Sequence, residues 1–399
     1  MPVEERNPAS LTSLNSRPLP PEGGRGEGAL LPGAATDHGN RQVAIVGGGP
    51  AGMALALALK LHGTAAAIFE ARERAAVRRD SRVLALSDGA RQILDWLGVW
   101  SGLAATPIDT IHISQRGGFG RSCLRAGELG VPALGWVVTA SDLIGALDAA
   151  VDAAGIVYRD TTKVGAGDTA AFALTAYAEG AVDPTAGQRR DYGQHAVLCS
   201  VGVAAPHRNV AFERFTNEGP VALLPLGERY AVVLTCADGI LETVMALDDA
   251  DFLLLLQQRF GSRHRFTAVS PRSAYPLGLR YRQDTVGERQ VWLGNAAQTL
   301  HPVAGQGFNL ALRDIWELAQ TLGAAYDPGA PELLAAYARG RQADRRGAIG
   351  FTDLLIEGFA TDFAPLKHLR GGGLLALDLL PPLRAFVARR MIYGARAWP

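Results

Sequence analysis

Apolar residues follow two kinds of pattern from residue 41 onward, and together they predict alternating strands and helices. Residues 43–46 and 66–70 are short, mostly apolar runs typical of buried strands, and residues 53–61 between them form an alanine- and leucine-rich helical pattern. Parallel strands need a crossover connection, which is usually a helix. This order of strand, helix and strand therefore predicts a parallel sheet covered by helices.

Later segments continue the mixture of elements. Thr139 and Ser141 are both suitable N-caps for one of the helices. From residue 331 the pattern is mostly helical, and residues 378–390 are amphipathic. Residues 1–40 are rich in glycine, proline and serine without apolar periodicity, so we expect a disordered extension there. Strands are predicted over 108–116, 221–226, 231–237 and 290–293, and helices over 84–100, 141–150, 249–260 and 310–318.

Composition narrows the function classes. The chain has 399 residues and a formal net charge of zero, so no overall positive field attracts nucleic acid, which is not an expected partner. Cys123, Cys199 and Cys236 lie far apart, which argues against a disulfide framework and against a zinc or iron–sulfur site. The sequence shows neither a secretion signal nor an uninterrupted apolar stretch of membrane-spanning length. We therefore expect a cytoplasmic protein with no bound metal.

A glycine-rich turn joins the first strand to the first helix. Residues 47–52 fit the pattern G-x-G-x-x-G, in which Gly47 permits the tight turn, Gly49 admits a pyrophosphate and Gly52 lets helix and strand pack closely. Glu70 ends the second strand, where a carboxylate binds ribose hydroxyls, as in FAD or NAD but not NADP. We assign these four residues and Ala51 to cofactor binding, and the alternative is a turn that binds no ligand.

Arg82 is the next candidate. It follows Asp80 and Ser81 and precedes an apolar run that we predict to be helical. An arginine that enters a helix can hold a phosphate or the edge of an isoalloxazine ring. Pairing of a surface arginine with Asp80 is the alternative, and both interpretations stay open on these residues alone.

The segment 294–309 lies between a predicted strand and a predicted helix. Its glycines and its proline allow the backbone to approach a flat or phosphorylated ligand, and the helix that follows directs free N–H groups toward that ligand. A flavin ring, which becomes anionic on reduction, is one such ligand. The candidate cofactor-binding residues here are Asn295, Pro302, Gly305, Gln306, Gly307 and Asn309.

His301 lies in the same segment and is a candidate general acid or base. A histidine that directly precedes a proline is more often structural. A catalytic role and a structural role are therefore both kept.

Taken together, these segments resemble the class A flavoprotein monooxygenases. Residues 47–52 with Glu70, residues 80–82 and residues 294–314 are similar to the branch that hydroxylates prenylated phenols in ubiquinone biosynthesis, of the 2-octaprenyl-6-methoxyphenol hydroxylase type. Further matches are 211–216, 219–226 and 273–277. The resemblance covers about residues 41–399, and 294–314 is its most specific part.

The resemblance implies an α/β fold like that of para-hydroxybenzoate hydroxylase. A Rossmann-like FAD-binding domain would be interleaved with a β-rich substrate domain, and a helical C-terminal part would follow. We assign 41–110, 141–195 and 285–345 to the FAD-binding domain, 111–140 and 196–284 to the substrate domain, and 346–399 to C-terminal helices.

The family also implies the chemistry. NAD(P)H would reduce the bound FAD, oxygen would form a flavin C4a-hydroperoxide, and this species would deliver OH to an electron-rich phenol ring. The expected substrate is thus a prenylated phenol, and other quinone-biosynthesis proteins are expected partners. The protein itself would orient the ring and exclude water.

One departure from the family keeps other readings open. The superfamily has an Ala-Asp-Gly-Ala segment, whereas residues 178–181 read Ala-Glu-Gly-Ala, so Glu179 is one methylene longer. The alternatives are a hydroxylase of another ring position or another aromatic compound, and a scaffold of a quinone-biosynthesis complex that has lost FAD.

A polyprenyl substrate resides in the bilayer, so the enzyme must dock on a membrane or receive substrate from a partner. Residues 374–380, followed by Arg384, Arg389 and Arg390, form an apolar and basic stretch that can lie on an anionic surface. This would make the protein peripheral on the inner face of a bacterial inner membrane. The alternative is a core-packing helix with solvated arginines.

Overall fold

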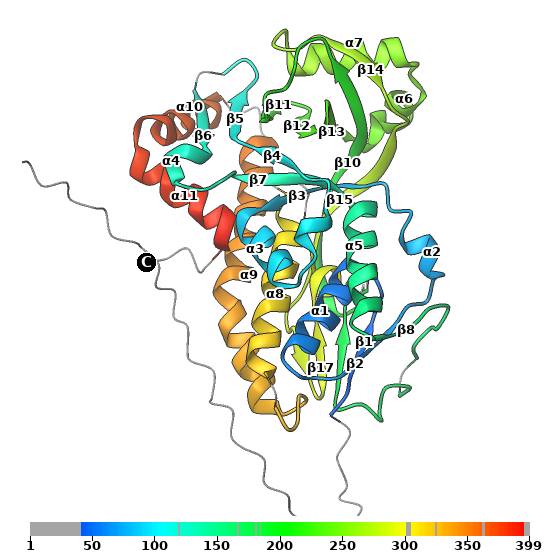
Figure 1. The fold of residues 1–399 in the computed structure, drawn as a ribbon. Coiled ribbons are helices and arrows are strands. Elements are labelled where there is room, and N and C mark those ends of the chain that lie inside the picture. The colour runs from blue at the N-terminus through cyan, green and yellow to red at the C-terminus, as the bar shows by residue number, and fades with distance from the viewer. Residues whose placement is uncertain are drawn as a thin grey trace, which may run out of the picture. The chain divides into compact units, whose positions relative to one another are not determined.

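The computed structural model of the chain (Figure 1) describes residues 41–118, 120–165, 167–179, 182–183, 185–300, 305–323, 325–360 and 364–394, with only the backbone for 354–360 and 364–367. The predicted extension 1–40 lies outside the described residues, as do His301 and Pro302. Everything below concerns the compact unit that begins at Gly39.

The predicted parallel sheet is present. Its order is β16-β17-β9-β1-β2-β8, in which every neighbouring pair is parallel except the edge pair β16 and β17. Helix α1 (Pro50–Leu61) packs against α5 (Ala140–Ala153) and α8 (Gln306–Leu322) and buries residues 52–59. The strands are β1 (Val43–Val46), β2 (Ala66–Phe69), β8 (Val157–Arg159), β9 (Leu174–Tyr177), β16 (Val286–Gly287) and β17 (Gln290–Trp292).

A second, larger sheet has the order β18-β15-β10-β13-β12-β11-β5-β6, with β14 paired to β10. One of its faces packs on α7 (Asp249–Phe260), which has the predicted bounds, and on α6 (Leu241–Ala246). Its strands are β5 (Thr110–Gln115), β6 (Arg121–Arg125), β10 (Gly187–Val203), β11 (Val210–Thr216), β12 (Gly219–Leu226), β13 (Arg229–Ala237), β14 (Phe266–Val269), β15 (Ser273–Arg282) and β18 (Gln298–Thr299).

A small sheet lies between these two, and here one prediction was wrong. The residues expected to begin a helix at 84 instead form strand β3 (Val83–Ser87), which pairs with β7 (Gly135–Thr139), as does β4 (Thr106–Ile108). The helix α3 starts only at Asp88 and ends at Trp96, and the Ser87 hydroxyl caps it by accepting from the Ala90 N–H. The alternation of Val-Leu-Ala-Leu-Ser fits a strand once β7 supplies a partner, which no local pattern reveals.

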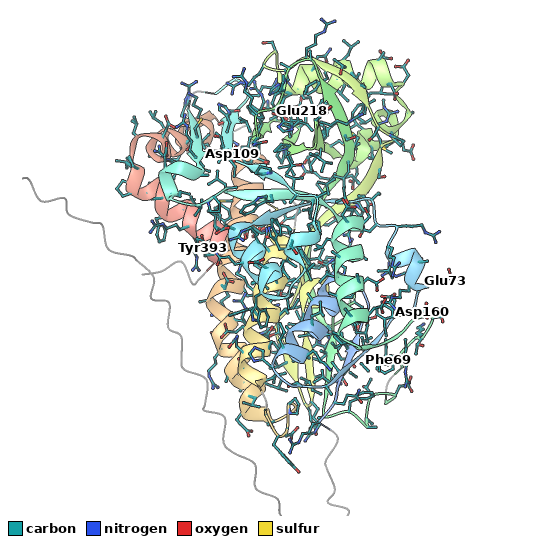
Figure 2. All side chains as sticks on the ribbon, in the orientation of Figure 1. Phe69, Glu73, Asp109, Asp160, Glu218 and Tyr393 are labelled. Atoms are coloured by element: carbon teal, nitrogen blue, oxygen red, sulfur yellow. The ribbon has the colours of Figure 1, made fainter. Side chains whose placement is uncertain are left out.

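The C-terminal part is helical, as predicted. It consists of α9 (Pro331–Ala360), α10 (Ala364–Leu379) and α11 (Pro381–Tyr393). None of the described helices is by itself long and apolar enough to cross a bilayer; the segments His368–Leu379 and Pro381–Tyr393 meet that criterion only as a pair bent by 99°. Tyr393, labelled in Figure 2, donates its hydroxyl hydrogen to Asp88 at 2.8 Å, and so ties the end of α11 to α3.

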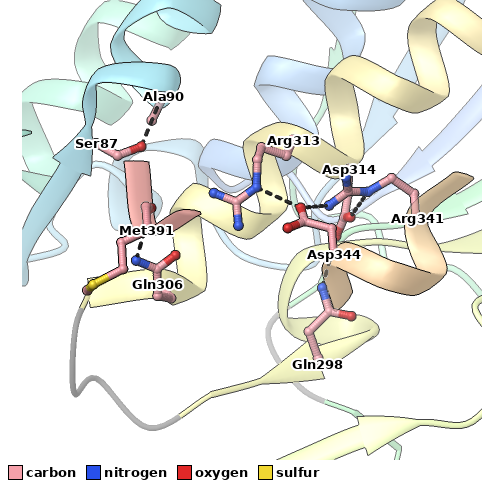
Figure 3. Close-up of polar contacts among 9 residues, drawn as sticks. All are labelled: Ser87, Ala90, Gln298, Gln306, Arg313, Asp314, Arg341, Asp344 and Met391. Carbon is pink, nitrogen blue, oxygen red and sulfur yellow. Dashed lines mark hydrogen bonds and ion pairs between the residues drawn. The ribbon is translucent and has the colours of Figure 1, made fainter. Parts of the chain in front are cut away.

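A buried charge network joins α8 to α9 (Figure 3). Arg341 contacts Asp314 and Asp344 at 2.7 Å each, and Arg313 contacts Asp344 at 2.8 Å. The side chains of these four residues are at most 8% exposed. Gln298 of β18 donates to Asp314 at 2.9 Å, so the network also fixes the strand that precedes residue 300.

We expect Arg341→Met to lower the free energy of unfolding by about 3–5 kcal/mol, because it leaves the buried Asp314 carboxylate without a cation and Asp344 with Arg313 alone. Arg346→Met, on the exposed side of the same helix, is the matched control and should cost less than about 0.5 kcal/mol. Urea unfolding at pH 7 measures both, and equal midpoints would contradict the prediction.

The difference between the two variants should depend on pH. Burial alone would raise the pKa of the Asp344 carboxyl, but Arg313 and Arg341 hold it below its ordinary value. Its stabilising contribution is therefore present above the pKa of an unfolded aspartate, about 3.9, and is lost as the pH falls through the lower folded value. The destabilisation by Arg341→Met should be full at pH 7 and shrink in acid.

Candidate functional site

The carboxyl ends of four parallel strands meet at one edge of the first sheet. β1 is followed by Gly47, β2 by Glu70, β9 by Ala178 and Glu179, and β17 by Leu293 and Gly294. In open α/β sheets, ligands bind in the crevice outside these strand ends, where neighbouring connections run to opposite sides. Residues from distant parts of the sequence are therefore gathered where the glycine motif predicts a ligand.

The three key glycines differ in what surrounds them. A methyl group on Gly52 would overlap the carbonyl oxygen of Gly47, and one on Gly47, whose φ is +110°, would lie 2.7 Å from the Glu179 nitrogen. A methyl group on Gly49 would meet nothing within 4 Å. Gly47 and Gly52 are thus required by packing, whereas the space beside Gly49 is open to a ligand.

The start of α1 has no internal partner for its free N–H groups. Its N-cap is Gly49, without a side-chain cap, Pro50 occupies the first turn, and no acidic residue lies there. The N–H groups of Ala51 and Gly52 and the positive end of the helix dipole therefore remain available for an anion. These features fit the pyrophosphate of a dinucleotide.

Glu70 is buried beside this turn. Its carboxylate accepts from the Gly48 N–H at 2.8 Å and from the Arg72 N–H and Nε at 3.0 and 2.9 Å. Burial alone would raise the pKa of Glu70, but the hydrogen bonds from Arg72 and Gly48 outweigh it and hold the pKa below its ordinary value. Glu70 is therefore ionised at neutral pH, as an acceptor for ribose hydroxyls must be.

Two residues near Glu70 were missed by the motif search. Arg72 covers the carboxylate, yet 61% of its own side chain is exposed, so it can move aside for a ribose. The Tyr158 hydroxyl donates to the Gly48 carbonyl at 3.1 Å and lies over the turn. Arg72 could have been found from the sequence, because it follows Glu70 by two residues. Tyr158 could not, because it comes from the distant strand β8.

Glu179, the departure from the family pattern, lies beside the same turn. Its backbone contacts Gly47, and its side chain is exposed. Partial desolvation of the carboxylate by the surrounding protein and then the negative charge of Glu70 raise the pKa of its carboxyl. Gly180 and Ala181, which follow it in the motif, lie outside the described residues.

The second candidate segment reaches the same edge. A methyl group on Gly294, whose φ is +55°, would lie 3.5 Å from the Ala51 side chain and 3.6 Å from that of Ala311. The strand end at Gly294 is thus wedged between the starts of α1 and α8. Asn295, in the short helical turn η3 (Gly294–Ala296), has an exposed side chain.

Helix α8 begins at Gly305, which has a φ of +59° and provides no side-chain cap. A methyl group on Gly305 would lie 3.2 Å from the Ala85 side chain, whereas one on Gly307 would meet no described residue within 4 Å. With no acidic residue in its first turn, α8 offers a second positive helix end with open space beside Gly307.

Two of the predicted contacts at this helix have other partners for their side chains. Asn309 is buried, accepts from the Ser87 N–H at 2.9 Å, and donates to the carbonyls of Ala85 and Gly305 at 2.9 and 2.7 Å. Gln306 donates to the Met391 carbonyl at 3.4 Å (Figure 3). Asn309 therefore clamps β3 to the helix start, and a ligand would meet the backbone here.

Arg82 does not enter a helix, contrary to the prediction, because the apolar run after it is strand β3. Its guanidinium contacts Asp80 at 2.6 and 3.0 Å, so the pairing considered as an alternative is present. The Arg82 side chain remains 44% exposed.

One carboxyl near the second sheet also escaped the motif search. Glu213 lies on β11 in the segment 211–216, and burial raises its pKa to about 7. Its side chain alternates with Phe212 and so lies on the same face as Ala211, which packs against Val137 of the small sheet. Glu213 thus lies on the face turned toward β7.

Comparisons with known proteins agree with this geometry. The chain matches the family model described as FAD binding domain over residues 40–167 and 179–352. It is 32% identical over 389 residues to ubiquinone hydroxylase UbiL of Rhodospirillum rubrum, with 90% of each chain covered. It is 29% identical over 378 residues to 3-demethoxyubiquinol 3-hydroxylase of Escherichia coli K12, covering 84% of this chain and 94% of that protein.

Solved structures share the fold. PqsL of Pseudomonas aeruginosa has a TM-score of 0.68 at 18% identity and covers 84% of this chain and 98% of its own. The p-nitrophenol 4-monooxygenase PnpA of Pseudomonas putida has a TM-score of 0.70 at 15% identity and covers 89% of this chain and 98% of its own. These likenesses confirm the predicted fold class.

The family model covers most of the chain, and a ubiquinone hydroxylase is related along nearly its whole length. The chain belongs to the FAD-binding class A flavoprotein monooxygenases, in the branch that contains the ubiquinone-biosynthesis hydroxylases.

Proposed function

We propose that this protein hydroxylates the aromatic ring of a prenylated phenol in ubiquinone biosynthesis, with FAD as cofactor and NAD(P)H as electron donor. The observation that carries the proposal is the sheet edge where Gly49 and Glu70 meet Gly294, which lies more than 200 residues further along the chain. When bound there, FAD supplies the oxygen-transfer chemistry, and the protein supplies position and electrostatics.

Different residues would bind different parts of the cofactor. The open side of Gly49 and the N–H groups of Ala51 and Gly52 would hold the diphosphate, and Glu70 would accept from the adenosine ribose after Arg72 turns away. Both helix starts would direct positive dipole ends toward anionic parts of one extended ligand.

The residues of the segment 294–309 would bind the flavin end of the cofactor. Asn295 would contact the ribityl chain, and the backbone of Gly305, Gln306 and Gly307 would contact the flavin ring, with Asn309 acting through the turn it clamps. Roles for Arg82, Pro302 and His301 remain part of the proposal. The domain boundaries 41–110, 141–195 and 285–345 for FAD, and 111–140 and 196–284 for substrate, belong to it too.

We further propose that the protein works at a membrane. A polyprenyl chain partitions into the bilayer, so a hydroxylase of such a phenol needs the bilayer surface or a partner protein of the same pathway. The exposed leucines of α10 and α11 give it an apolar surface for a peripheral position on the inner face of a bacterial inner membrane.

The purified protein reconstituted with FAD should show a flavin absorption spectrum that bleaches with NADH or NADPH and recovers in air. A strain that lacks this protein should accumulate the prenylated phenol that precedes the blocked hydroxylation, and mass spectrometry identifies it. A protein that stays colourless after reconstitution would rule out the hydroxylase and favour a scaffold.

Gly49→Ala and Gly52→Ala separate ligand contact from packing. Gly49→Ala should change the free energy of unfolding of the apoprotein by no more than about 1 kcal/mol, because the added methyl meets open space. Its affinity for FAD should fall at least about tenfold, because the same methyl occupies the path of the diphosphate. Fluorescence titration with FAD and thermal unfolding without FAD give the two readouts.

Gly52→Ala is the matched comparison. Its methyl overlaps the Gly47 carbonyl, so we expect the apoprotein itself to be destabilised by about 2 kcal/mol or more. If Gly49→Ala bound FAD as tightly as the parent, the diphosphate would lie elsewhere.

A further inference from the structure

A basic groove lies on the outer edge of the second sheet, between that edge and α10. Two adjoining cavities of about 380 and 490 Å³ form it, and both are lined by His112, Arg121, Arg263 and Asp378. Arg214 lines the larger cavity. The helix closely borders the groove, because a methyl group on Gly120 would overlap the backbone of α10.

Positive charge in the groove is not neutralised by the protein. Among the described residues, Arg121, Arg214 and Arg263 form no ion pair, and Asp378 is the one acidic residue of the lining. Arg384, expected from the sequence to face an anionic surface, is instead paired with Glu128 at 2.8 Å. The free charge therefore comes from β6, β11 and the turn after α7, and not from α11.

Several buried polar atoms of the groove have no partner within the described part of the chain. His112 is 8% exposed, and no described residue bonds either of its ring nitrogens; the same holds for the buried Nε of Arg214 and Oε1 of Gln115. Such groups cost free energy when buried without a partner. Burial and then the neighbouring arginines, Arg263 first, lower the pKa of His112, so like charges are crowded around it.

The groove lies across the sheet from the proposed flavin site. His112 stacks near Phe212 at 5.6 Å, on the face that packs on α7. Ala211 points the other way and packs with Val137 of β7, in the small sheet whose strand β3 touches Gly305. An anion in the groove would thus be separated from the flavin site by the sheet itself.

Apolar side chains rim the groove on its helical side. Leu375 of α10 lines the larger cavity and is 40% exposed. The bend between α10 and α11 exposes more large apolar side chains, and a cluster of this kind beside a basic site is typical of membrane-binding surfaces. They are Leu379, Leu380, Leu383 and Phe386, and Leu369, earlier on α10, is exposed as well.

We propose that the groove binds the phosphate of an anionic phospholipid headgroup while the leucines of the α10–α11 bend enter the acyl region. This inference rests on the proposed function only in that a polyprenyl substrate requires a membrane. Arg121 and Arg263 are exposed and reach the phosphate first, and Arg214, Gln115 and the His112 ring line the groove behind them. Charge complementarity selects an anionic surface over a zwitterionic one.

Flotation with vesicles tests the proposal on the full-length, FAD-loaded protein. The parent should bind vesicles of phosphatidylcholine with 30% phosphatidylglycerol and should not bind phosphatidylcholine alone. The double variant Arg121→Gln with Arg263→Gln should bind the anionic vesicles roughly thirtyfold more weakly, the loss expected for two arginines at an anionic surface. The matched control, Arg339→Gln with Arg346→Gln, removes the same charge from the exposed face of α9 and should bind like the parent.

A stability readout separates binding from folding. Because Arg263 lies among like charges, Arg121→Gln with Arg263→Gln should leave the thermal midpoint of the lipid-free protein unchanged or raised. Equal vesicle binding by the parent and this double variant would overturn the headgroup site. Binding of inorganic phosphate by the parent only, without vesicle binding, would overturn its assignment to lipid. Bleaching of the flavin by NAD(P)H in the same samples reports on the proposed function independently.

Discussion

The buried network of Arg313, Asp314, Arg341 and Asp344 is the constraint on which the rest of this structure depends. Four charges held out of water are tolerable only while each keeps its partners, so α8 and α9 have one permitted alignment. A Cβ on Gly394 would lie 2.7 Å from Arg313 Nε, so the chain after α11 also closes over the network. Helices α8 and α9 and the end of α11 are thereby fixed around one set of charges.

That alignment determines where α8 points. Asp314 lies about two turns from the start of the helix, so fixing it fixes the direction of the N–H groups at Gln306 and Gly307. Asn309 then holds the helix start to β3 through the Ser87 N–H and the Ala85 carbonyl. A helix end that is clamped on two sides needs no reorganisation when charge develops on a ligand, which is how a protein stabilises a reduced flavin at low cost.

The sequence predicted the parts of this arrangement that depend on local chemistry. The turn at Gly47 and Gly52, the strand that ends before Glu70 and the helix at 249–260 all follow from neighbours within one supersecondary unit. Thr139 and Ser141 were both suitable N-caps for α5, and Thr139 is the one that caps the helix. The strand at Val83–Ser87 was predicted as a helix because its partner β7 lies some 50 residues away.

The side-chain roles were harder to predict for the same reason. Asn309 and Gln306 looked like ligand contacts because they sit at a helix start, but their partners come from β3 and α11. His112 belongs to no sequence motif. Its position in the groove follows only from the packing of β5, β11 and α10 around it. The type of a residue and its spacing in the sequence indicate which chemistry its side chain can perform. Long-range packing determines which partner that side chain has.

The two faces of the second sheet provide different environments for the alternating residues of one strand. Alternate residues of β11 place Phe212 against α7 and Ala211 against the small sheet. Positive charge lies at the exposed edge of this sheet, where Arg121 and Arg263 lie beside the His112 ring. With the proposed flavin site across the same sheet, the two anion-attracting regions would be separate, so a headgroup in the groove would not compete with the cofactor.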